Sequence, residues 1–395
     1  MQKDLSSGGT FKSRSLRGVT KWSLWVLLRL RCLVPVGWHP PEADCEARGW
    51  FDKPNANAGN GFRISGFVLR ISPERCIMED QAIRLNDYSW AYRGARVLHL
   101  ANRLGLFTAI ADRDVSLDRI CNLLKTKPEF TQKLLIALCS MDLLEKIGDR
   151  YTNSQISDTY LVKGKPFYQG DMIAHSDYIR RYWENLENQI YIDPPADITE
   201  DEGHRHFIMA MDNIASTGRV ELFLESIDLT GRKNLLDVGG GPGSYSIAAC
   251  RKYPQLKATV FDLPATTEIA TKVVARDEMQ DRVTVCPGDW DTDDFGEGFD
   301  VIMFSNVLHG PAGNAPMKLA KARAAIEVGG LLVVQEFILN DEKTGPQAPA
   351  LFNVMVGAYS NKEIIDVITH AGFTDVKVTG QSEKLAATWI TAKKT

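Results

Sequence analysis

The chain has 395 residues, of which 44% are hydrophobic and 24% charged, and its formal net charge at pH 7 is −4. This is the composition of a globular protein with more than one domain, and the slight acidity argues against nucleic acid or an anionic membrane as the main partner. The seven cysteines form no CxxC pair and no His/Cys set at zinc-ligand spacing, so we expect reduced thiols, no bound metal and a cytoplasmic protein.

The first 77 residues differ in composition from the rest of the chain. They contain 12 Lys or Arg, six Asp or Glu and four of the eight tryptophans, without regular periodicity. An apolar run at residues 22–38 is interrupted by two arginines and is shorter than the ~20 residues that span a bilayer. Basic residues before a short apolar stretch also suggest a signal peptide, but no clear cleavage site follows. We predict a poorly ordered extension over 1–77 and a folded protein from Met78.

Residues 78–165 have the pattern of a winged helix. Apolar residues recur at helical spacing over 88–111, a helix capped by Ser116 follows, and a further helix is predicted over 130–148. The polar segment 148–162 resembles a β-wing. Because the last of these helices has many leucines and few cations, the pattern favours a dimerisation surface over DNA binding.

Residues 166–230 form a predicted helical linker that is rich in aromatic residues and methionine. Such a stripe more often belongs to a protein core than to a pocket, but for most of the candidates named next the sequence leaves both possibilities open. With three residues nearer the C-terminus, the candidate pocket residues are His175, Tyr178, Tyr182, Met209, Met211, Phe352, Asn353 and Met355.

Residues 231–395 alternate between strands and helices. Near-continuous apolar strands in such an alternation predict a parallel α/β sheet covered on both faces. The last two strands follow each other directly and resemble a hairpin. The predicted strands are 234–239, 257–262, 282–289, 299–307, 330–337, 374–381 and 384–392.

A glycine-rich turn follows the first of these strands. The segment LLDVGGGPGSYS places Asp237 at the end of the strand and then Gly239, Gly241 and Gly243 at alternate positions. Glycines there allow a sharp turn and close approach of a ligand to the backbone. The spacing differs from the GxGxxG of dinucleotide-binding proteins, and no GxxxxGK[ST] phosphate loop is present.

Two further acids end the next two strands. A carboxylate at Asp262 suits the hydroxyls of a ribose, and Asp289 suits an adenine amino group with Trp290 as a flat apolar wall. Asp237 adds negative charge for a cationic ligand. An adenosine with a positive centre and no phosphate meets all of these requirements, and the set therefore predicts S-adenosylmethionine.

These motifs, together with NVLH and GGLLVVQEF, resemble the small-molecule O-methyltransferases of the caffeic acid and acetylserotonin type. The resemblance runs from about Met78 to the C-terminus. It implies a seven-stranded sheet of order 3-2-1-4-5-7-6, an N-terminal winged-helix dimerisation domain, a homodimer and a substrate pocket between the domains. It assigns ribose to Asp262, adenine to Asp289 and Trp290, and the methionine part to the glycine loop. Leu263 and Ser305, in the same motifs, complete the expected cofactor site.

Two residues are expected to act on the acceptor. His309 follows the fourth strand at the edge where ligands bind in such sheets, and the resemblance assigns it the role of general base. Glu336 ends the fifth strand and matches the carboxylate that orients this histidine. Most simply, the enzyme methylates the hydroxyl of a small, aromatic molecule.

The sequence departs from the family pattern at two places around this base. Gly310 stands where the family has an aspartate, and Ala358 or Tyr359 stands where it has a second glutamate, while Glu363 falls later in a predicted helix. These departures keep alternatives open: methylation of a thiol or thioether, which needs little base catalysis, methylation of carbon on a tetrapyrrole, or a catalytically silent S-adenosylmethionine-binding regulator.

Overall fold

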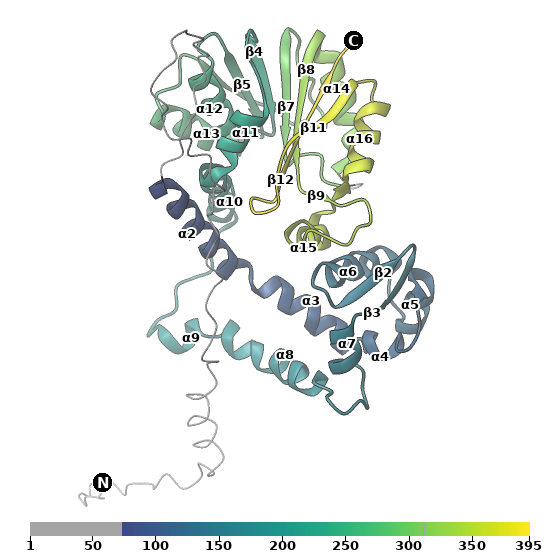
Figure 1. Ribbon diagram of the computed structural model, residues 1–395. Helices are drawn as coiled ribbons and strands as arrows, with labels where there is room; N and C mark the ends of the chain where they lie inside the picture. Colours follow the sequence, from purple (N-terminus) through teal and green to yellow (C-terminus); the bar gives the residue numbers. More distant parts are fainter. Residues whose placement is uncertain (1–72, 311–312) are drawn as a thin grey trace, which may run out of the picture. The chain divides into compact units, whose positions relative to one another are not determined.

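The computed structural model describes residues 73–310 and 313–395, with its elements labelled in Figure 1. The expected extension over 1–77 therefore lies almost entirely outside the described residues. Helix α2 (Pro73–Trp90) already begins at Pro73.

The N-terminal part of the described chain is a helical domain with a small antiparallel sheet of order β1-β3-β2. As predicted, the Ser116 hydroxyl caps a helix by accepting from the Arg119 amide. Apolar side chains from helices α3, α4, α5 and α6 form one core. The elements are α3 (Tyr92–Arg103), α4 (Leu106–Ala109), β1 (Val115–Ser116), α5 (Leu117–Leu124), α6 (Pro128–Ser140), β2 (Leu144–Ile147), β3 (Arg150–Asn153) and α7 (Gln155–Tyr160).

Two predicted boundaries in this domain are wrong. The helix predicted over 130–148 ends at Ser140, because Asp142 adopts a left-handed φ of 56° and the chain then continues as strand β2. The strand-like segment 148–162 ends at Asn153, because the Ser154 hydroxyl accepts from the Ser157 amide and starts helix α7. The wing is therefore the β2–β3 hairpin alone.

A helical segment joins this domain to the sheet. It comprises α8 (Gly170–Glu184), α9 (Glu187–Ile190), α10 (Glu200–Ile214), the π-turn η1 (Ala215–Arg219) and α11 (Val220–Ser226). Helix α10 begins with a capping box between Thr199 and Glu202. The chain bends at Gly218, whose φ of 97° suits glycine. Beyond the bend, the side chain of Arg219 is buried.

The C-terminal part contains a seven-stranded sheet of order β11-β12-β8-β7-β4-β5-β6. Strands β4 to β8 are parallel, and β12 is antiparallel to both of its neighbours. In chain order this is the predicted 3-2-1-4-5-7-6 arrangement, which is confirmed. The strands are β4 (Asn234–Val238), β5 (Lys257–Asp262), β6 (Val283–Pro287), β7 (Phe299–Ser305), β8 (Ile326–Glu336), β11 (Thr374–Ser382) and β12 (Ala387–Lys393).

Helices cover both faces of this sheet (Figure 1). Leu235 of β4 packs with α11, α12 (Ser244–Lys252) and α13 (Pro264–Arg276) on one face. The next residue, Leu236, packs with α14 (Ala315–Ala325) and α16 (Asn361–His370) on the other. Because successive side chains of a strand alternate between faces, a strand buried on both sides must be apolar throughout, as the sequence pattern indicated.

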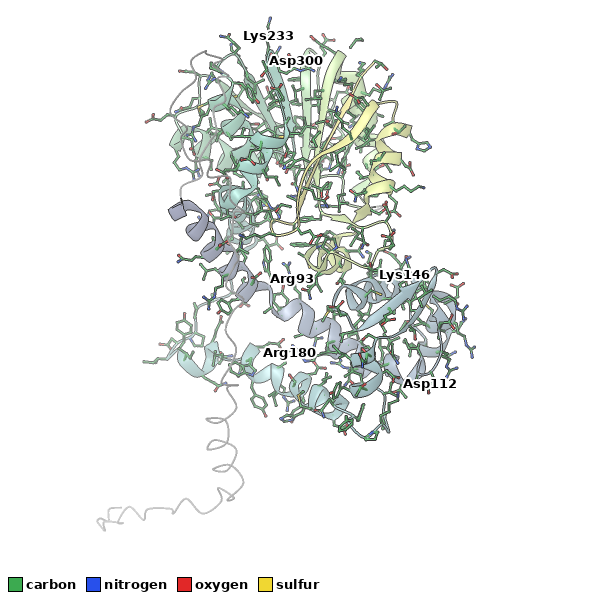
Figure 2. The ribbon with its side chains drawn as sticks, in the orientation of Figure 1. Arg93, Asp112, Lys146, Arg180, Lys233 and Asp300 are labelled. Atoms are coloured by element: carbon green, nitrogen blue, oxygen red, sulfur yellow. The ribbon has the colours of Figure 1, made fainter. Side chains whose placement is uncertain are left out.

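The two ends of the parallel strands have different chemistry. At the amino ends, the Asp300 carboxylate accepts from the amides of Lys233 and Asn234, 2.8 and 2.9 Å away, and so fixes the start of β4 (Figure 2). The carboxyl ends hold the glycine turn and the predicted site residues. Short strands β9 (Ile338–Leu339) and β10 (Tyr359–Ser360), with helix α15 (Gln347–Val356), lie beyond β8, and α15 contacts α6 of the N-terminal domain.

Candidate active site

The glycine turn connects β4 to α12 at the carboxyl edge of the sheet. Gly239, Gly241 and Gly243 have φ values of 68°, 55° and 82°, a region that other L-residues rarely adopt. A Cβ atom on Gly239 would lie 2.7 Å from both the Trp290 ring and Val307. The turn is therefore packed beneath a tryptophan, and glycine is required there both by conformation and by space.

Asp237 is fully buried, one residue before the end of β4. Its Oδ2 accepts from the Ser246 hydroxyl at 2.7 Å, whereas its Oδ1 has no hydrogen-bond partner in the described part of the chain. Burial raises the pKa of this carboxyl to about 7, and the nearby Asp262 acts in the same direction. An unpartnered, buried carboxylate oxygen suits a cationic group of a ligand.

Asp262 ends the neighbouring strand β5 and anchors the glycine turn. Its Oδ2 accepts from the Gly241 amide and its Oδ1 from the Leu263 amide, each at 2.8 Å. Each oxygen keeps further lone-pair capacity for a ligand hydroxyl. The side chain of Leu263 is 41% exposed beside it, an apolar surface next to a carboxylate.

Asp289 and Trp290 follow β6 at the same edge. Asp289 accepts from the Asp291 amide at 2.9 Å, which makes a tight turn. The half-buried ring of Trp290 lies against Gly239 on one side and 4.3 Å from the ammonium of Lys318. That ammonium donates to the Val307 carbonyl at 3.0 Å, and burial lowers the pKa of Lys318. The tryptophan is thus held in place by two neighbours.

Ser305, predicted to bind the cofactor, bonds to the adjacent strand. Its hydroxyl donates to Gln335 Oε1 at 2.9 Å and also bonds to the hydroxyl of Tyr245. Tyr245 in turn bonds to the buried guanidinium of Arg219, which also donates to the Leu385 carbonyl at 2.9 Å. This polar network links β7, β8 and α12 to Arg219.

His309 and Glu336 come together as predicted. The Nδ1 of His309 lies 2.9 Å from Oε2 of Glu336, and the Leu308 amide donates to the other carboxylate oxygen at 2.6 Å. The glutamate side chain is 2% exposed and the histidine side chain 26% exposed. The carboxylate is therefore buried, with a hydrogen bond at each of its oxygens, while part of the imidazole is accessible.

An aromatic column extends from this histidine. The rings of His309 and Phe337 are stacked with centroids 5.9 Å apart, and Phe337 stacks on Phe352 of α15 at 4.4 Å. Trp90 meets Phe352 edge-on at 5.7 Å. The column combines residues from α2, from the end of β8 and from α15, so it exists only in the folded chain.

Gly310 and the pair Ala358–Tyr359 stand at the two positions where the family has acidic residues beside the base. A Cβ atom on Gly310 would lie 3.0 Å from the backbone of Gly357, so that backbone occupies the space of a side chain. Ala358 and Tyr359 are buried, and burial raises the pKa of Tyr359 to about 12. Glu363 closes the capping box of α16. In the described residues, Glu336 is the carboxylate that bonds to His309, and no second one does.

The predicted pocket residues divide into two groups. Phe352 joins the aromatic column, and Asn353 is buried beside it, with its Oδ1 accepting from the Ala358 amide and its Nδ2 unpartnered within the described structure. The other six lie on α8, on α10 or, for Met355, exposed on α15, where it lines a cavity between α3, α6 and α15. They are His175, Tyr178, Tyr182, Met209, Met211 and Met355.

Several residues at this edge were missed by the sequence analysis. Asn306 and Gln335 each have a buried side-chain atom without a partner in the described structure, as has Arg93. The position of Asn306 and Phe337 directly after strands β7 and β8 is a signal that could have identified them. No local pattern marks Arg93 or Arg219, which reach the site by tertiary packing.

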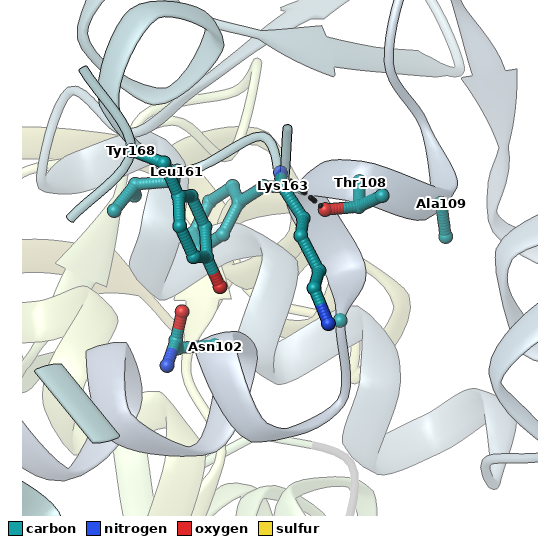
Figure 3. A pocket seen from close by; sticks show the side chains of 8 residues that line it. Asn102, Thr108, Ala109, Leu161, Lys163 and Tyr168 are labelled. Carbon is teal, nitrogen blue, oxygen red and sulfur yellow. Dashed lines mark hydrogen bonds between the residues drawn. The ribbon is translucent and has the colours of Figure 1, made fainter. Parts of the chain in front are cut away.

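Two cavities lie outside this edge. One of about 400 Å³ lies in the N-terminal domain and is lined by Asn102, Thr108, Lys163 and Tyr168, among others, and the Lys163 amide donates to Thr108 there (Figure 3). The second, of about 650 Å³, lies between α3, α6 and α15.

Among the described residues, no cluster of His, Cys, Asp or Glu has the arrangement of a metal site. In the same residues, every helix is too short or too polar to cross a bilayer.

Comparison with known proteins identifies the family. Residues 87–163 match an O-methyltransferase dimerisation domain, and residues 195–374 match an O-methyltransferase domain. The chain is 30% identical over 312 residues to 3-hydroxy-5-methyl-1-naphthoate 3-O-methyltransferase of Streptomyces sahachiroi, with 74% of this chain and 90% of that protein covered. It is 28% identical over 319 residues to the tetracenomycin polyketide synthesis 8-O-methyl transferase TcmO of Streptomyces glaucescens, with 74% and 91% covered.

A solved structure agrees on the fold. The O-methyltransferase family 2 protein from Planctomyces limnophilus, crystallised in complex with apigenin, superposes with a TM-score of 0.66 at 24% identity, over 79% of this chain and 96% of that one. The N-terminal match supports the expected homodimer, and the predicted methyl donor and reaction class are those of the family. The chain belongs to the S-adenosylmethionine-dependent O-methyltransferases that carry an N-terminal dimerisation domain.

Proposed function

We propose that this enzyme methylates the hydroxyl group of a planar aromatic compound, with His309 as the general base and Glu336 as its positioning residue. The observation that carries the proposal is the 2.9 Å contact between His309 Nδ1 and Glu336 Oε2 at the carboxyl edge of the sheet. The relatives named for a naphthoate and for tetracenomycin polyketide synthesis support an aromatic acceptor.

The residues of the sheet edge fit S-adenosylmethionine. Asp237 offers a buried oxygen without a partner in the described structure, which would face the cationic methionine end. Asp262 would accept from the ribose hydroxyls with its remaining lone pairs. Asp289 and the fixed ring of Trp290 would bind the adenine. The glycine turn, where no side chain intervenes, allows the ligand to approach the backbone closely.

When bound, S-adenosylmethionine supplies a methyl group on a positively charged sulfur. Because the donor is already activated, the protein has two tasks: to align the acceptor oxygen and to remove its proton. The first falls to the rings beside the site, and the second to His309.

Glu336 determines which nitrogen of His309 acts as the base. A carboxylate at Nδ1 accepts a hydrogen bond from it, so that the proton of the neutral ring resides there and Nε2 remains free to accept the acceptor proton. The same carboxylate stabilises the imidazolium that forms. Since its second oxygen is held by the Leu308 amide, Glu336 has a fixed orientation.

The experiment is methyl transfer from labelled S-adenosylmethionine to a panel of hydroxyarenes by the parent enzyme and by His309→Gln. A positioned base is worth roughly 10²–10⁴-fold, so the variant should lose that factor in kcat. His370→Gln, on the exposed end of α16, is the matched control and should retain full activity. The affinity for S-adenosylmethionine should stay within a few-fold in both variants.

Two results would contradict this assignment. A His309→Gln enzyme within threefold of the parent would mean that proton removal is not needed, and would favour a thiol or thioether acceptor. Transfer to carbon would be visible directly from the site of the label in the product. Either result would leave the methyl donor and the family unchanged.

We also propose that the enzyme works in the cytoplasm. The described cysteines are free, and burial raises the pKa of Cys139 to about 12 and that of Cys250 to about 11, so that both thiols are poorly reactive. Alkylation of the protein directly in cell lysate, followed by mass spectrometry, should find every cysteine reduced. A disulfide in freshly isolated protein would contradict the proposal.

A further inference from the structure

The aromatic column beside His309 ends in a cation. Arg93 lies near the start of α3 (Figure 2). Its guanidinium carbon lies 4.4 Å from the ring centroid of Phe352 and 4.7 Å from that of Trp90. Phe352 stacks on Phe337, which faces His309. The order along the column is therefore imidazole, two phenyl rings and a guanidinium.

Arg93 has no acidic partner in the described structure. Its Nε is buried and forms no hydrogen bond with any described residue. By contrast, its neighbours on the same helix, Arg96 and Arg103, both bond to Asp177 of α8. A partly buried guanidinium is normally satisfied by carboxylate or carbonyl oxygens, and its aromatic contacts leave the N–H groups unused. The N–H groups of Arg93 can therefore donate hydrogen bonds to an anion.

A cavity of about 650 Å³ adjoins Arg93 between α3, α6 and α15. Leu100, Phe130, Leu134, Leu351 and Met355 make most of its wall apolar. Its charged lining residues are all basic: Arg93, Arg96, Lys125 and Lys127. An apolar space with only positive charges at its wall complements an apolar molecule that carries a negative charge.

We propose that Arg93 is the specificity residue for an aromatic acceptor that carries a carboxylate, with the carboxylate bound at Arg93 and the hydroxyl placed at His309. The proposal rests on the proposed function, since it requires that the acceptor lie along the column. The cavity then takes the part of the acceptor beyond the carboxylate. The anion completes the hydrogen bonding of the guanidinium, which a neutral phenol leaves unsatisfied.

The same geometry accounts for the chemistry near His309. A second carboxylate beside the base, as the family has, would repel an anionic acceptor. Here Gly310 and the backbone of Gly357 fill that position instead, while Arg219 lies 5.5 Å from the Phe337 ring. Among the described residues, Glu336 is the carboxylate that bonds to His309, and its side chain is buried with 2% exposure.

The test compares hydroxyaryl carboxylic acids of two to four fused rings with their methyl esters, which keep the rings and the hydroxyl but lack the charge. The range of lengths is needed because two phenyl rings lie between His309 and Arg93 in the column. Calorimetry measures binding, and labelled S-adenosylmethionine measures methyl transfer, for the parent, Arg93→Met, Arg93→Lys and Arg103→Met. The parent should prefer at least one acid over its ester by about 10- to 100-fold, the range expected for a charge-assisted hydrogen bond. Arg93→Met should abolish the preference by weakening acid binding alone, and Arg93→Lys should restore part of it.

Arg103→Met is the matched control, because it removes an arginine from the same helix that already has an acidic partner. It should leave the preference unchanged. Equal binding of acid and ester by the parent, or a preference that survives in Arg93→Met, would overturn the inference. So would the absence of detectable acid binding. Acid binding that depends on Arg93 but is followed by no methyl transfer would support the inference and refute the proposed acceptor chemistry instead.

Discussion

Asp237 is buried at the end of β4, and its replacement by asparagine should remove a pH dependence of the protein's stability. Asparagine has nearly the same shape and can still accept from the Ser246 hydroxyl, which lies 2.7 Å from the carboxylate. The substitution therefore changes mainly the ability to ionise. Its effect on stability should therefore be small while the carboxyl is protonated and should grow in favour of the variant as the pH rises.

The magnitude follows from the pKa of this carboxyl. Burial raises that pKa from 3.8 to about 7 in the folded protein, whereas the unfolded chain ionises near 3.8. Between these values the folded protein binds a proton that the unfolded chain has lost, so the free energy of unfolding falls as the pH rises and levels off above about pH 7. At about 1.4 kcal/mol per pKa unit, the loss due to Asp237 approaches about 4 kcal/mol.

The assay is urea unfolding of the parent and Asp237→Asn from pH 5 to pH 8.5, without ligand. Titrating groups that do not interact with Asp237 contribute equally to both proteins and cancel in the difference. The variant should gain stability over the parent steadily up to about pH 7. Asp281→Asn, at an exposed position, should show a constant difference across the range. A constant difference for Asp237→Asn as well would refute the reasoning, because it would mean that the carboxyl ionises normally.

Other predictions concern the cofactor site and the base. Gly239→Ala should lower both stability and affinity for S-adenosylmethionine more than Gly231→Ala does. Both glycines have a positive φ, but only at Gly239 would the added Cβ atom lie 2.7 Å from the Trp290 ring. Thermal unfolding and calorimetry compare the two variants, and equal losses would refute the role of this contact. Asp262→Ala should weaken S-adenosylmethionine binding by at least about 100-fold, because it removes hydrogen bonds between the carboxylate and the ribose hydroxyls that are worth roughly 1.5–3 kcal/mol each. Unchanged affinity in calorimetry would show that the ribose site is assigned wrongly. Glu336→Gln should reduce kcat, though less than His309→Gln does, with little change in the KM of the acceptor; a rise in KM alone would indicate a binding role.

Much of the fold follows from local sequence. The strands were predictable because a strand buried on both faces must be apolar at every position, and Leu235 and Leu236 indeed pack on opposite faces. The glycine turn was predictable because its glycines adopt positive φ values that few other residues tolerate. The meeting of His309 and Glu336 was also within reach, since the carboxyl ends of neighbouring parallel strands lie at one edge.

Local signals were less reliable where two structures compete for the same residues. The leucine-rich helix was predicted to continue to Gly148, but the left-handed residue Asp142 ends it, and the following apolar residues suit a strand as well as a helix. The wing was predicted too long, because a polar segment with serine can start a helix as easily as it can extend a strand. There the Ser154 cap decided the outcome.

The sequence by itself determined the methyl donor, because the donor site depends on residues at strand ends with fixed spacing, and its motifs carried the family resemblance that implied the order of the sheet. Only the tertiary structure decided what surrounds the acceptor. The backbone of Gly357 takes the place of an acid at Gly310, and Arg93 reaches Phe352 across more than half of the chain. Such contacts join segments with no regular spacing between them, so their energies depend on packing distances that no local pattern records.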